Sequence, residues 1–299
     1  MSSKSPNPIF SICGIMGLFT NRLLPPNKHT IALGGSIINK MNKKSKKLII
    51  ANWKMNPNTL REAKVLYGVI RTKANRMQNV QSVVCPPFVF ISELQKISKG
   101  QRLILGAQDV FYEKSGAYTG EISASMLYDV GARYVIVGHS ERRALGESDE
   151  FIAKKVQSIL KGKMKAVLCV GEKKRDEGDY LHFLRKQVTD SLAGVSKHSL
   201  KNLIIAYEPI WAIGKGAIPD KAEDAEETIL FIKKVLIEKF GKKDAGLVPV
   251  LYGGSVGIKN TESFLEMGGI DGLLIGRASL DVKQFGEILQ QASSASNGL

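Results

Sequence analysis

Three polar side chains lie just after apolar runs and could together perform acid–base chemistry. Glu208 follows Leu203–Tyr207 in IIAYEPIWAIG, and His139 follows Tyr134–Val137 in VGHSERR. A carboxylate can remove a proton from carbon, and an imidazole can give or take a proton near neutral pH. Lys54, in ANWKMN, could stabilise negative charge on a substrate. One chemistry open to this set is therefore proton transfer on an anionic small molecule.

Each of these residues also has an ordinary structural interpretation. Glu208 could be a helix N-cap or a surface acid, and Lys54 could be a solvated loop residue. His139 could be a core residue or a metal ligand, although the Pro-Cys-x-x-Cys that accompanies His-x-Glu in zinc deaminases is missing. Asn52 lies two positions before Lys54, so strand alternation puts both on one side and Trp53 on the other. Asn52 and Lys54 could then offer an amide and a cation to one ligand.

Two glycine-containing segments end the last two apolar runs and could hold a phosphate. They are YGGSV at 252–256 and IGRASL at 275–280. Glycine lets backbone N–H groups approach an anion, and a following helix N-terminus adds favourable partial charge. The sequence has no P-loop, and Gly214-Lys215-Gly216 lacks the third glycine of a dinucleotide fingerprint.

These residues need a scaffold that brings the ends of separate strands together. Amphipathic segments with helical spacing, such as 60–74 and 225–236, separate short apolar runs. Strands buried on both faces and separated by helices imply a parallel sheet. Eight such units over about 250 residues predict a (β/α)₈ barrel, with a doubly wound sheet as the second choice, and functional residues at the C-terminal ends of the strands. The eight runs are Leu48–Trp53, Val80–Cys85, Leu103–Ala107, Tyr134–Val137, Ala166–Val170, Leu203–Tyr207, Val248–Tyr252 and Gly272–Ile275.

The chain is expected to contain one barrel domain at 47–299, preceded by an extension at 1–46 outside the barrel. The extension shows no sustained apolar period, so it is interpreted as disordered or as the product of a misassigned start, with Met41 as the alternative start. Eight of the 15 net positive charges lie before Leu48. Because the remainder is only mildly basic and lacks clustered aromatic residues, no nucleic-acid partner is expected.

The compartment is expected to be reducing and the protein cytoplasmic. The 3 cysteines form no C-x-x-C pair, which disfavours a disulfide framework. No run approaches the roughly 18 apolar residues of a membrane span, so no membrane association is expected. An organellar leader is the second choice, because residues 1–46 lack acidic residues but contain a single arginine.

With these motifs in view, the chain resembles the triose-phosphate isomerase family from about Leu48 to Leu289. The resemblance implies an enzyme of glycolysis and gluconeogenesis, without cofactor or metal, that interconverts dihydroxyacetone phosphate and D-glyceraldehyde 3-phosphate through an enediolate. The motifs are highly specific together, although each alone would be only suggestive. They are ANWKMN, TGEIS, VGHSERR, YEPIWAIG, YGGSV and IGRASL.

The resemblance also implies catalytic roles. Glu208 would be the base that moves a proton between neighbouring carbons, and neutral His139 would polarise the carbonyl and move protons between the oxygens. This pairing is the known one of the family and is carried over, not deduced. Lys54 and Asn52 would stabilise the charge on the enediolate oxygens.

The remaining implied roles concern support, binding and assembly. Ser140 would contact the resting Glu208, and Glu141 would be a supporting carboxylate. Pro209–Gly216 resembles the family's mobile lid. Thr119, in GAYTGE, would reach into a second subunit and support its active site, so a homodimer is implied. Backbone N–H groups would bind the phosphate, those of Gly214, Ser255, Gly276 and Arg277.

The chain departs from the family pattern at two places in this site. Only Ala217 and Ile218 separate Gly216 from Pro219, a shorter hinge than in most relatives, and Arg277 stands where many relatives have glycine. Two other functions therefore stay open. One is a Schiff-base aldolase with Lys54 as its nucleophile, and the other is a non-catalytic phosphate-binding scaffold.

Overall fold

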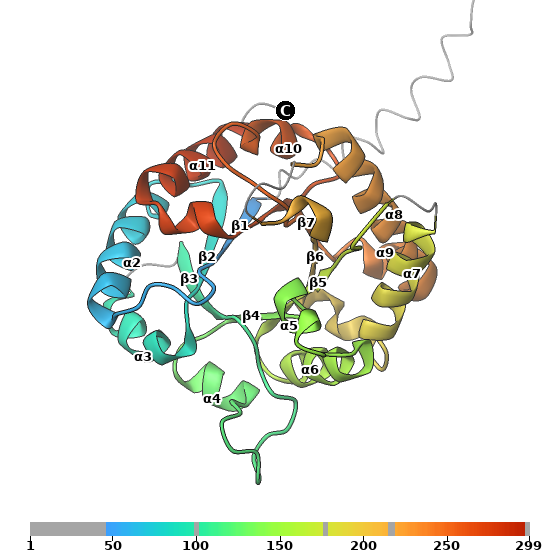
Figure 1. The fold of residues 1–299 in the computed structure, drawn as a ribbon, viewed down its shortest axis with the longest axis horizontal. Helices are drawn as coiled ribbons and strands as arrows, with labels where there is room; N and C mark the ends of the chain where they lie inside the picture. The colour runs from blue at the N-terminus through green and yellow to red at the C-terminus, as the bar shows by residue number, and fades with distance from the viewer. Residues whose placement is uncertain (1–45, 99–101, 176–178, 215–218, 297–299) are drawn as a thin grey trace, which may run out of the picture. The chain divides into compact units, whose positions relative to one another are not determined.

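The part of the chain that is described forms a closed barrel of parallel strands. The computed structural model describes residues 46–98, 102–175, 179–214 and 219–296. Strands pair in sequential order, and β1 pairs with β2 on one side and β8 on the other (Figure 1). This confirms the (β/α)₈ prediction over the doubly wound sheet. The strands are β1 (Lys47–Asn52), β2 (Val80–Cys85), β3 (Leu103–Ala107), β4 (Tyr134–Val137), β5 (Lys165–Val170), β6 (Leu203–Tyr207), β7 (Val250–Tyr252) and β8 (Gly272–Ile275).

Helices surround the strands and bury the outer face of the barrel (Figure 1). The α-helices are α2 (Leu60–Ala74), α3 (Phe88–Ile97), α4 (Ala124–Asp129), α5 (Ser140–Ala144), α6 (Asp149–Lys161), α7 (Tyr180–Ser191), α8 (Ala222–Phe240), α9 (Lys242–Ala245), α10 (Thr261–Glu266) and α11 (Val282–Ala295). Short 3₁₀ helices are η1 (Lys197–Asn202), η2 (Ile210–Ala212) and η3 (Arg277–Leu280). The predicted extension at 1–46, of which only residue 46 is described, stays a prediction.

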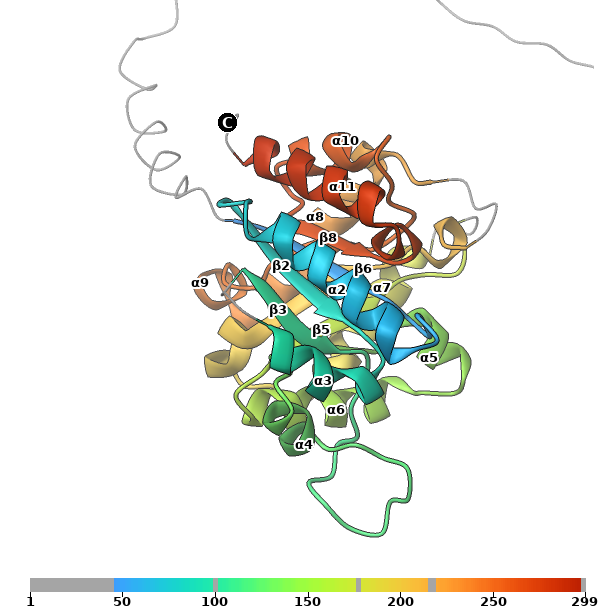
Figure 2. The same cartoon turned by 90° about the vertical axis from the view of Figure 1, so that its left-hand side faces the viewer.

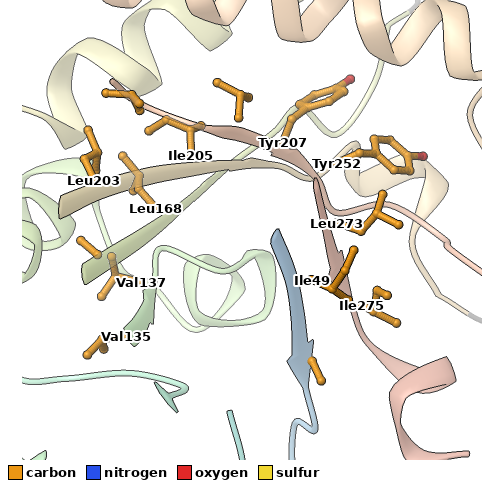
Figure 3. Packing of buried hydrophobic residues seen from close by; sticks show 14 of the residues in the cluster. Ile49, Val135, Val137, Leu168, Leu203, Ile205, Tyr207, Tyr252, Leu273 and Ile275 are labelled. Atoms are coloured by element: carbon orange, nitrogen blue, oxygen red, sulfur yellow. The ribbon is translucent and has the colours of Figure 1, made fainter. Parts of the chain in front are cut away.

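Alternation along the strands divides the core into two layers. On β1, Ile49 and Ala51 pack with residues of the surrounding helices, whereas Leu48 and Ile50 belong to a cluster made of strand residues alone. The second cluster therefore fills the barrel interior. Figure 3 shows outward-facing side chains of several strands, including Tyr207 of β6. Because both faces are covered, the strands read as nearly continuous apolar runs.

The sequence at the start of α2 shows how a helix on the outer layer is fixed. The Thr59 side chain accepts a hydrogen bond from the Glu62 N–H, and the Glu62 carboxylate accepts one from the Thr59 N–H, both at 3.2 Å. This capping box satisfies backbone donors that a helix start leaves free, and such a cap stabilises by about 1 kcal/mol. Ala63, Tyr67 and Ile70 then face the barrel at helical spacing.

Strand boundaries differ from the predicted runs at two informative places. β7 begins at Val250 and not at Val248, because the intervening Pro249 has no N–H to donate to a neighbouring strand. β1 ends at Asn52, and Trp53 turns its fully buried ring into the outer layer. The prediction that Trp53 faces away from Asn52 is consistent with this packing.

The loop between β3 and α4 projects away from the barrel (Figure 2). It carries Thr119 and Tyr118, and both are exposed. No helix within the described residues is long and apolar enough to cross a membrane. Cys85 and Cys169 are buried and carry free thiols.

Candidate active site

A cavity of ≈ 380 Å³ opens at the C-terminal ends of the strands. It collects residues from β1, β4, β6, β7 and β8 or from the loops that follow them, which is where a (β/α)₈ barrel places its chemistry. Most of the site residues predicted from the sequence line this one cavity. They are Asn52, Lys54, His139, Glu208, Gly214, Ser255, Gly276 and Arg277.

Glu208 lies at the end of β6 with only 2% of its surface exposed. Its N–H continues the sheet by donating to the Val170 carbonyl at 2.7 Å, which fixes the backbone beside the end of β5. One carboxylate oxygen, Oε2, accepts a hydrogen bond from the Ser140 N–H at 3.2 Å. The other, Oε1, lies 3.2 Å from His139 Nε2. Glu208 therefore contacts Ser140, as the resemblance implied, although through the Ser140 backbone N–H. It also lies beside His139.

The tautomer of His139 follows from its hydrogen bonds. His139 is the N-cap of α5, and its Nδ1 accepts a hydrogen bond from the Glu141 N–H at 3.2 Å. A nitrogen that accepts carries no proton, so a neutral imidazole has its proton on Nε2. Nε2 faces Glu208 across the cavity. His139 can thus act as a hydrogen-bond donor toward a substrate oxygen without being charged.

Lys54 occupies a strained backbone position, with φ = 53° in the left-handed region that residues other than glycine seldom adopt. Its N–H donates to Asn52 Oδ1 at 3.0 Å, and the Gln108 amide donates to its carbonyl at 2.8 Å. The Lys54 ammonium lies 2.5 Å from Glu141 Oε1. These contacts direct the ammonium to the mouth of the cavity. Asn52 lines the same cavity.

The first glycine of the loop after β7 lies against the Glu208 side chain. A Cβ at Gly253 would lie 2.9 Å from Glu208 Cγ and 3.3 Å from the Tyr207 carbonyl, so this glycine makes room for the carboxylate. Ser255 donates twice to the Ala212 carbonyl, from its N–H at 3.2 Å and from Oγ at 2.6 Å. The Ser255 N–H that was predicted to bind phosphate is therefore occupied by Ala212 in this structure.

The supporting and peripheral residues lie outside the main cavity. Ser140 and Glu141 line a neighbouring cavity of ≈ 720 Å³ that shares Asn52, Lys54 and Arg277 with it. Thr119 is not among the residues that line either cavity. The shortened hinge at 217–219 lies largely outside the described residues, which resume at Pro219.

Sequence reasoning missed Glu172, which lies two residues after the end of β5. Glu172 is 2% exposed, and its Oε1 accepts hydrogen bonds from Tyr207, Trp211 and Arg175 at 2.8, 2.9 and 3.1 Å. Its carbonyl accepts from the Ile210 N–H at 2.9 Å. Glu172 thereby anchors the segment directly after Glu208. Its place after a buried strand was the signal that could have found it.

The thiol of Cys169 lies next to the Glu208 carboxylate. Burial, followed by the negative charge of Glu208, raises the pKa of this thiol well above its ordinary value. The thiol therefore stays protonated and neutral, and a neutral neighbour adds no second charge beside Glu208. Within the described part of the chain, no group of three or more His, Cys, Asp or Glu side chains could hold a metal ion.

A buried carboxylate paired with an imidazole at the mouth of a closed barrel defines a (β/α)₈-barrel enzyme that moves protons on a small substrate. Comparison with known proteins narrows this class. The family model described as triosephosphate isomerase matches residues 47–292, and the chain belongs to that family. Membership makes it an isomerase that interconverts dihydroxyacetone phosphate and D-glyceraldehyde 3-phosphate, as the motifs predicted.

Curated relatives and a solved structure agree with this assignment. A triosephosphate isomerase of Dehalococcoides mccartyi is 44% identical over 249 residues, which are 82% of this chain and 97% of the relative. One of Aquifex aeolicus is 44% identical over 247 residues, 82% of this chain and 98% of the relative. The crystal structure of triosephosphate isomerase from Bartonella henselae matches with a TM-score of 0.72 and 34% identity, covering 82% of this chain and 98% of that one.

Proposed function

We propose that Glu208 and His139 perform the proton transfers of this isomerisation. The observation that carries the proposal is the 3.2 Å contact between Glu208 Oε1 and His139 Nε2 inside the cavity that also holds Lys54. A general base and a hydrogen-bond donor are needed on neighbouring atoms of the substrate, and this pair supplies both within hydrogen-bond reach. A bound substrate would lie between the two side chains and replace their mutual contact.

The proposed reaction starting from dihydroxyacetone phosphate conserves every proton. The Glu208 carboxylate takes a proton from the hydroxymethyl carbon. The electrons of that C–H bond form the carbon–carbon double bond of the enediolate, and the π electrons of the carbonyl move onto its oxygen. His139 Nε2 gives its proton to that oxygen and takes one from the neighbouring hydroxyl. The protonated Glu208 then returns its proton to the former carbonyl carbon. Lys54 and Asn52 stabilise the negative oxygens, and losing one such donor typically lowers turnover by about 10²–10³-fold.

The environment of Lys54 supports isomerisation over Schiff-base chemistry. A Schiff base needs a neutral amine, usually one whose charge is destabilised by burial or by another cation. Lys54 instead lies 2.5 Å from the Glu141 carboxylate, and its side chain keeps 30% of its surface exposed. Neither feature is the burial or the neighbouring cation that typically activates a Schiff-base lysine. Borohydride added with substrate should therefore trap no adduct on Lys54, and trapping would favour the aldolase.

Phosphate binding is proposed for the loops that follow β7 and β8, together with Gly214. Backbone N–H groups there would bind the substrate phosphate, those of Gly214, Ser255, Gly276 and Arg277. Because the Ser255 N–H now donates to the Ala212 carbonyl, phosphate binding requires that Ala212 move away. A non-catalytic scaffold would bind phosphate in the same loops, but it would have no use for a base beside an imidazole.

A homodimer and a cytoplasmic location complete the proposal. The projecting loop with Thr119 would enter a second subunit, and the exposed apolar side chains of Phe88 and Tyr118 support an interface on this side.

The free, buried thiols of Cys85 and Cys169 favour a reducing compartment. Cell fractionation with antibody detection tests the location, and recovery in an organelle would contradict it.

The central experiment is a coupled assay of glyceraldehyde 3-phosphate conversion with Glu208→Gln as the comparison. Glutamine keeps the shape but cannot accept the proton, so turnover should fall by about 10²–10⁴-fold or more. Binding of inorganic phosphate should stay nearly unchanged, because Glu208 touches the reacting carbon and not the phosphate. The assay is run on the full chain and on a chain that starts at Met41, in which we expect equal turnover.

Two outcomes would overturn these assignments. Unchanged turnover in Glu208→Gln would remove Glu208 from the chemistry. Phosphate binding without turnover in the unaltered, folded chain would instead favour the non-catalytic scaffold. The conservative change Glu208→Asp refines the test, because it retracts the base without removing it, and should lower kcat while leaving phosphate affinity nearly intact.

A further inference from the structure

Arg277 lies beside the proposed phosphate site, where two cavities meet. It is the first residue of η3, directly after Gly276 at the end of β8, and it is exposed. It lines both the ≈ 380 Å³ cavity and the ≈ 720 Å³ cavity at the barrel mouth. A Cβ at Gly276 would lie 3.5 Å from Lys54 Cε, so this loop passes directly against the Lys54 side chain. Arg277 thus brings a second cation to the rim that Lys54 occupies.

The two cations differ in how far their charge is already neutralised. The Lys54 ammonium is ion-paired with Glu141 at 2.5 Å. Arg277 forms no ion pair with any side chain in the described part of the chain. We propose that the Arg277 guanidinium contacts the substrate phosphate directly and sets the affinity of this site for phosphorylated substrates. The inference deepens the proposed function and rests on it, because it assumes that phosphate binds here.

The acid closest in sequence does not compete for Arg277. Asp281 also lines the ≈ 380 Å³ cavity, but it caps α11. Its Oδ1 accepts the N–H groups of Lys283 and Gln284 at 2.8 and 3.0 Å, and its Oδ2 accepts the Gln284 side-chain amide at 3.1 Å. These bonds commit the Asp281 carboxylate to the cap of α11, and no ion pair joins it to Arg277 in the described part of the chain. The Arg277 guanidinium is therefore left available to an incoming anion.

A guanidinium at this rim would add a full positive charge to the proposed phosphate site. Backbone N–H groups carry only partial charges, and both donors of Ser255 are occupied by the Ala212 carbonyl. A guanidinium offers parallel N–H donors that match two phosphate oxygens, which makes such bonds shorter and stronger than neutral ones. Glycine at position 277 would supply the backbone N–H but not this charge. The side chain is thus a second contribution, separate from the backbone role proposed above.

The test measures inorganic phosphate as a calorimetric ligand and as a competitive inhibitor of the full chain. Arg277→Gln keeps a long polar side chain but removes the charge. We expect Arg277→Gln to bind phosphate about 5- to 20-fold more weakly, because it loses hydrogen bonds from a charged group. The low end of this range applies if solvent screens the exposed guanidinium. Arg277→Lys restores the charge without the planar fork and should recover part of the loss.

Lys283→Gln is the matched control. Lys283 is exposed, lies six positions further along the chain and lines neither cavity, so this change removes the same charge from the same region without touching the site. We expect unchanged phosphate affinity. If Arg277→Gln binds phosphate as tightly as the unaltered chain, the inference is wrong. A loss of equal size in Lys283→Gln would also overturn it, because the effect would then come from the general field of the molecule.

Failure of the inference is separable from failure of the proposed function. Calorimetry with inorganic phosphate needs no turnover, so it reports on Arg277 even if the chain proves inactive in the isomerase assay. Turnover in the unaltered chain with unchanged phosphate binding in Arg277→Gln would overturn only the role of Arg277. An expected rise in KM for glyceraldehyde 3-phosphate, in parallel with weaker phosphate binding, would place the effect on substrate recognition.

Discussion

At the scale of single residues, Gly253 is the most informative position next to Glu208, the proposed base. An added methyl group at 253 would lie 2.9 Å from Glu208 Cγ, closer than real Cβ atoms come to a neighbour. Because the Tyr207 carbonyl blocks the other direction at 3.3 Å, the Glu208 side chain has to move. A displacement of about 1 Å in a reacting group can cost about 10²-fold in rate. We therefore expect Gly253→Ala to lower kcat by about 10- to 100-fold, measured in the coupled assay.

Gly257→Ala provides the comparison in the same loop. A Cβ at Gly257 would meet nothing within 4 Å, so this change adds a methyl group without contacting the base. We expect normal kcat and normal thermal unfolding in Gly257→Ala. Equal kcat in the two variants would mean that Gly253 does not set the position of Glu208.

Candidate residues of the site could be predicted from the sequence, but the contacts among them could not. Glu208 and His139 could be found because each follows a buried strand, and a barrel brings all strand ends to one mouth. Gln108 directly follows β3 and Glu172 lies two residues after β5, yet their partners are backbone and side-chain atoms far apart in sequence. Such partners depend on the three-dimensional arrangement of the loops. The use of Gly253 as space for Glu208 is likewise invisible in a one-dimensional pattern.

At the scale of elements, Arg175 ties the loop after β5 to β6 and α8. Its Nη2 donates to Tyr207 at 2.7 Å, to Thr228 at 3.0 Å and to Asp220 at 3.2 Å. Burial nevertheless raises the pKa of Asp220 to about 6, because losing water costs the carboxylate more than the ion pair with Arg175 regains. Asp220 is 7% exposed, which agrees with that cause.

This shift predicts how the free energy of unfolding depends on pH. An Asp220 pKa raised above its unfolded value of 3.8 means that the folded chain holds the proton more tightly. Its contribution to stability is thus fully present below pH about 4 and is lost as the pH rises through about 6. We expect the unaltered chain to lose roughly 1–3 kcal/mol relative to Asp220→Asn between these pH values, measured by urea unfolding at each pH.

Asp281→Asn is the control with the opposite sign. Hydrogen bonds from Gln284 and Lys283 lower the pKa of the exposed Asp281, so its contribution is present above its unfolded pKa and is lost only as the pH falls below about 4. The stability difference between the unaltered chain and Asp281→Asn should therefore be flat between pH 4 and 6. A flat profile for Asp220→Asn over the same range would contradict the raised pKa.

Prediction of the elements from the sequence succeeded where burial alone sets the pattern. The runs Val80–Cys85, Leu103–Ala107 and Leu203–Tyr207 coincide with β2, β3 and β6, because strands covered on both faces are apolar throughout. The predicted start of β7 was two residues too early, because the apolar run continues through Pro249, which has no N–H for strand pairing. Backbone hydrogen bonding, which apolarity does not report, decided that boundary.

At the scale of the whole molecule, one side of the barrel carries apolar side chains that a monomer would leave in water. Phe88 at the start of α3 is 57% exposed, its neighbour Val89 is 62% exposed, and Tyr118 on the projecting loop is 42% exposed. Phe88 also lines a cavity of ≈ 320 Å³ together with Gly120 and Glu121 at the base of that loop. Exposed apolar surface of this kind is typical of an interface. A second copy of the chain is the partner that the family resemblance implies.

The proposed dimer predicts different effects for two substitutions that each replace an exposed apolar side chain by glutamate. Phe88→Glu places a charge on the proposed interface, whereas Leu247→Glu places one before β7, at the opposite end of the barrel, where Leu247 is 55% exposed. Both residues are exposed in the single chain, so neither change should cost much more than about 0.5 kcal/mol of monomer stability. A buried unpaired charge would, however, cost several kcal/mol at an interface. Only Phe88→Glu should therefore dissociate the dimer.

Sedimentation or light scattering measures this directly, since the chain has a mass of 32.7 kDa and a dimer has twice that mass. If the loop carrying Thr119 supports the active site of the partner, the dissociated Phe88→Glu chain should also lose turnover, although Phe88 does not line the ≈ 380 Å³ cavity. Turnover should then recover at protein concentrations that restore the dimer, because assembly and not local chemistry limits it. A fully active monomer would show that each barrel completes its own site and would remove the assembly role of Thr119.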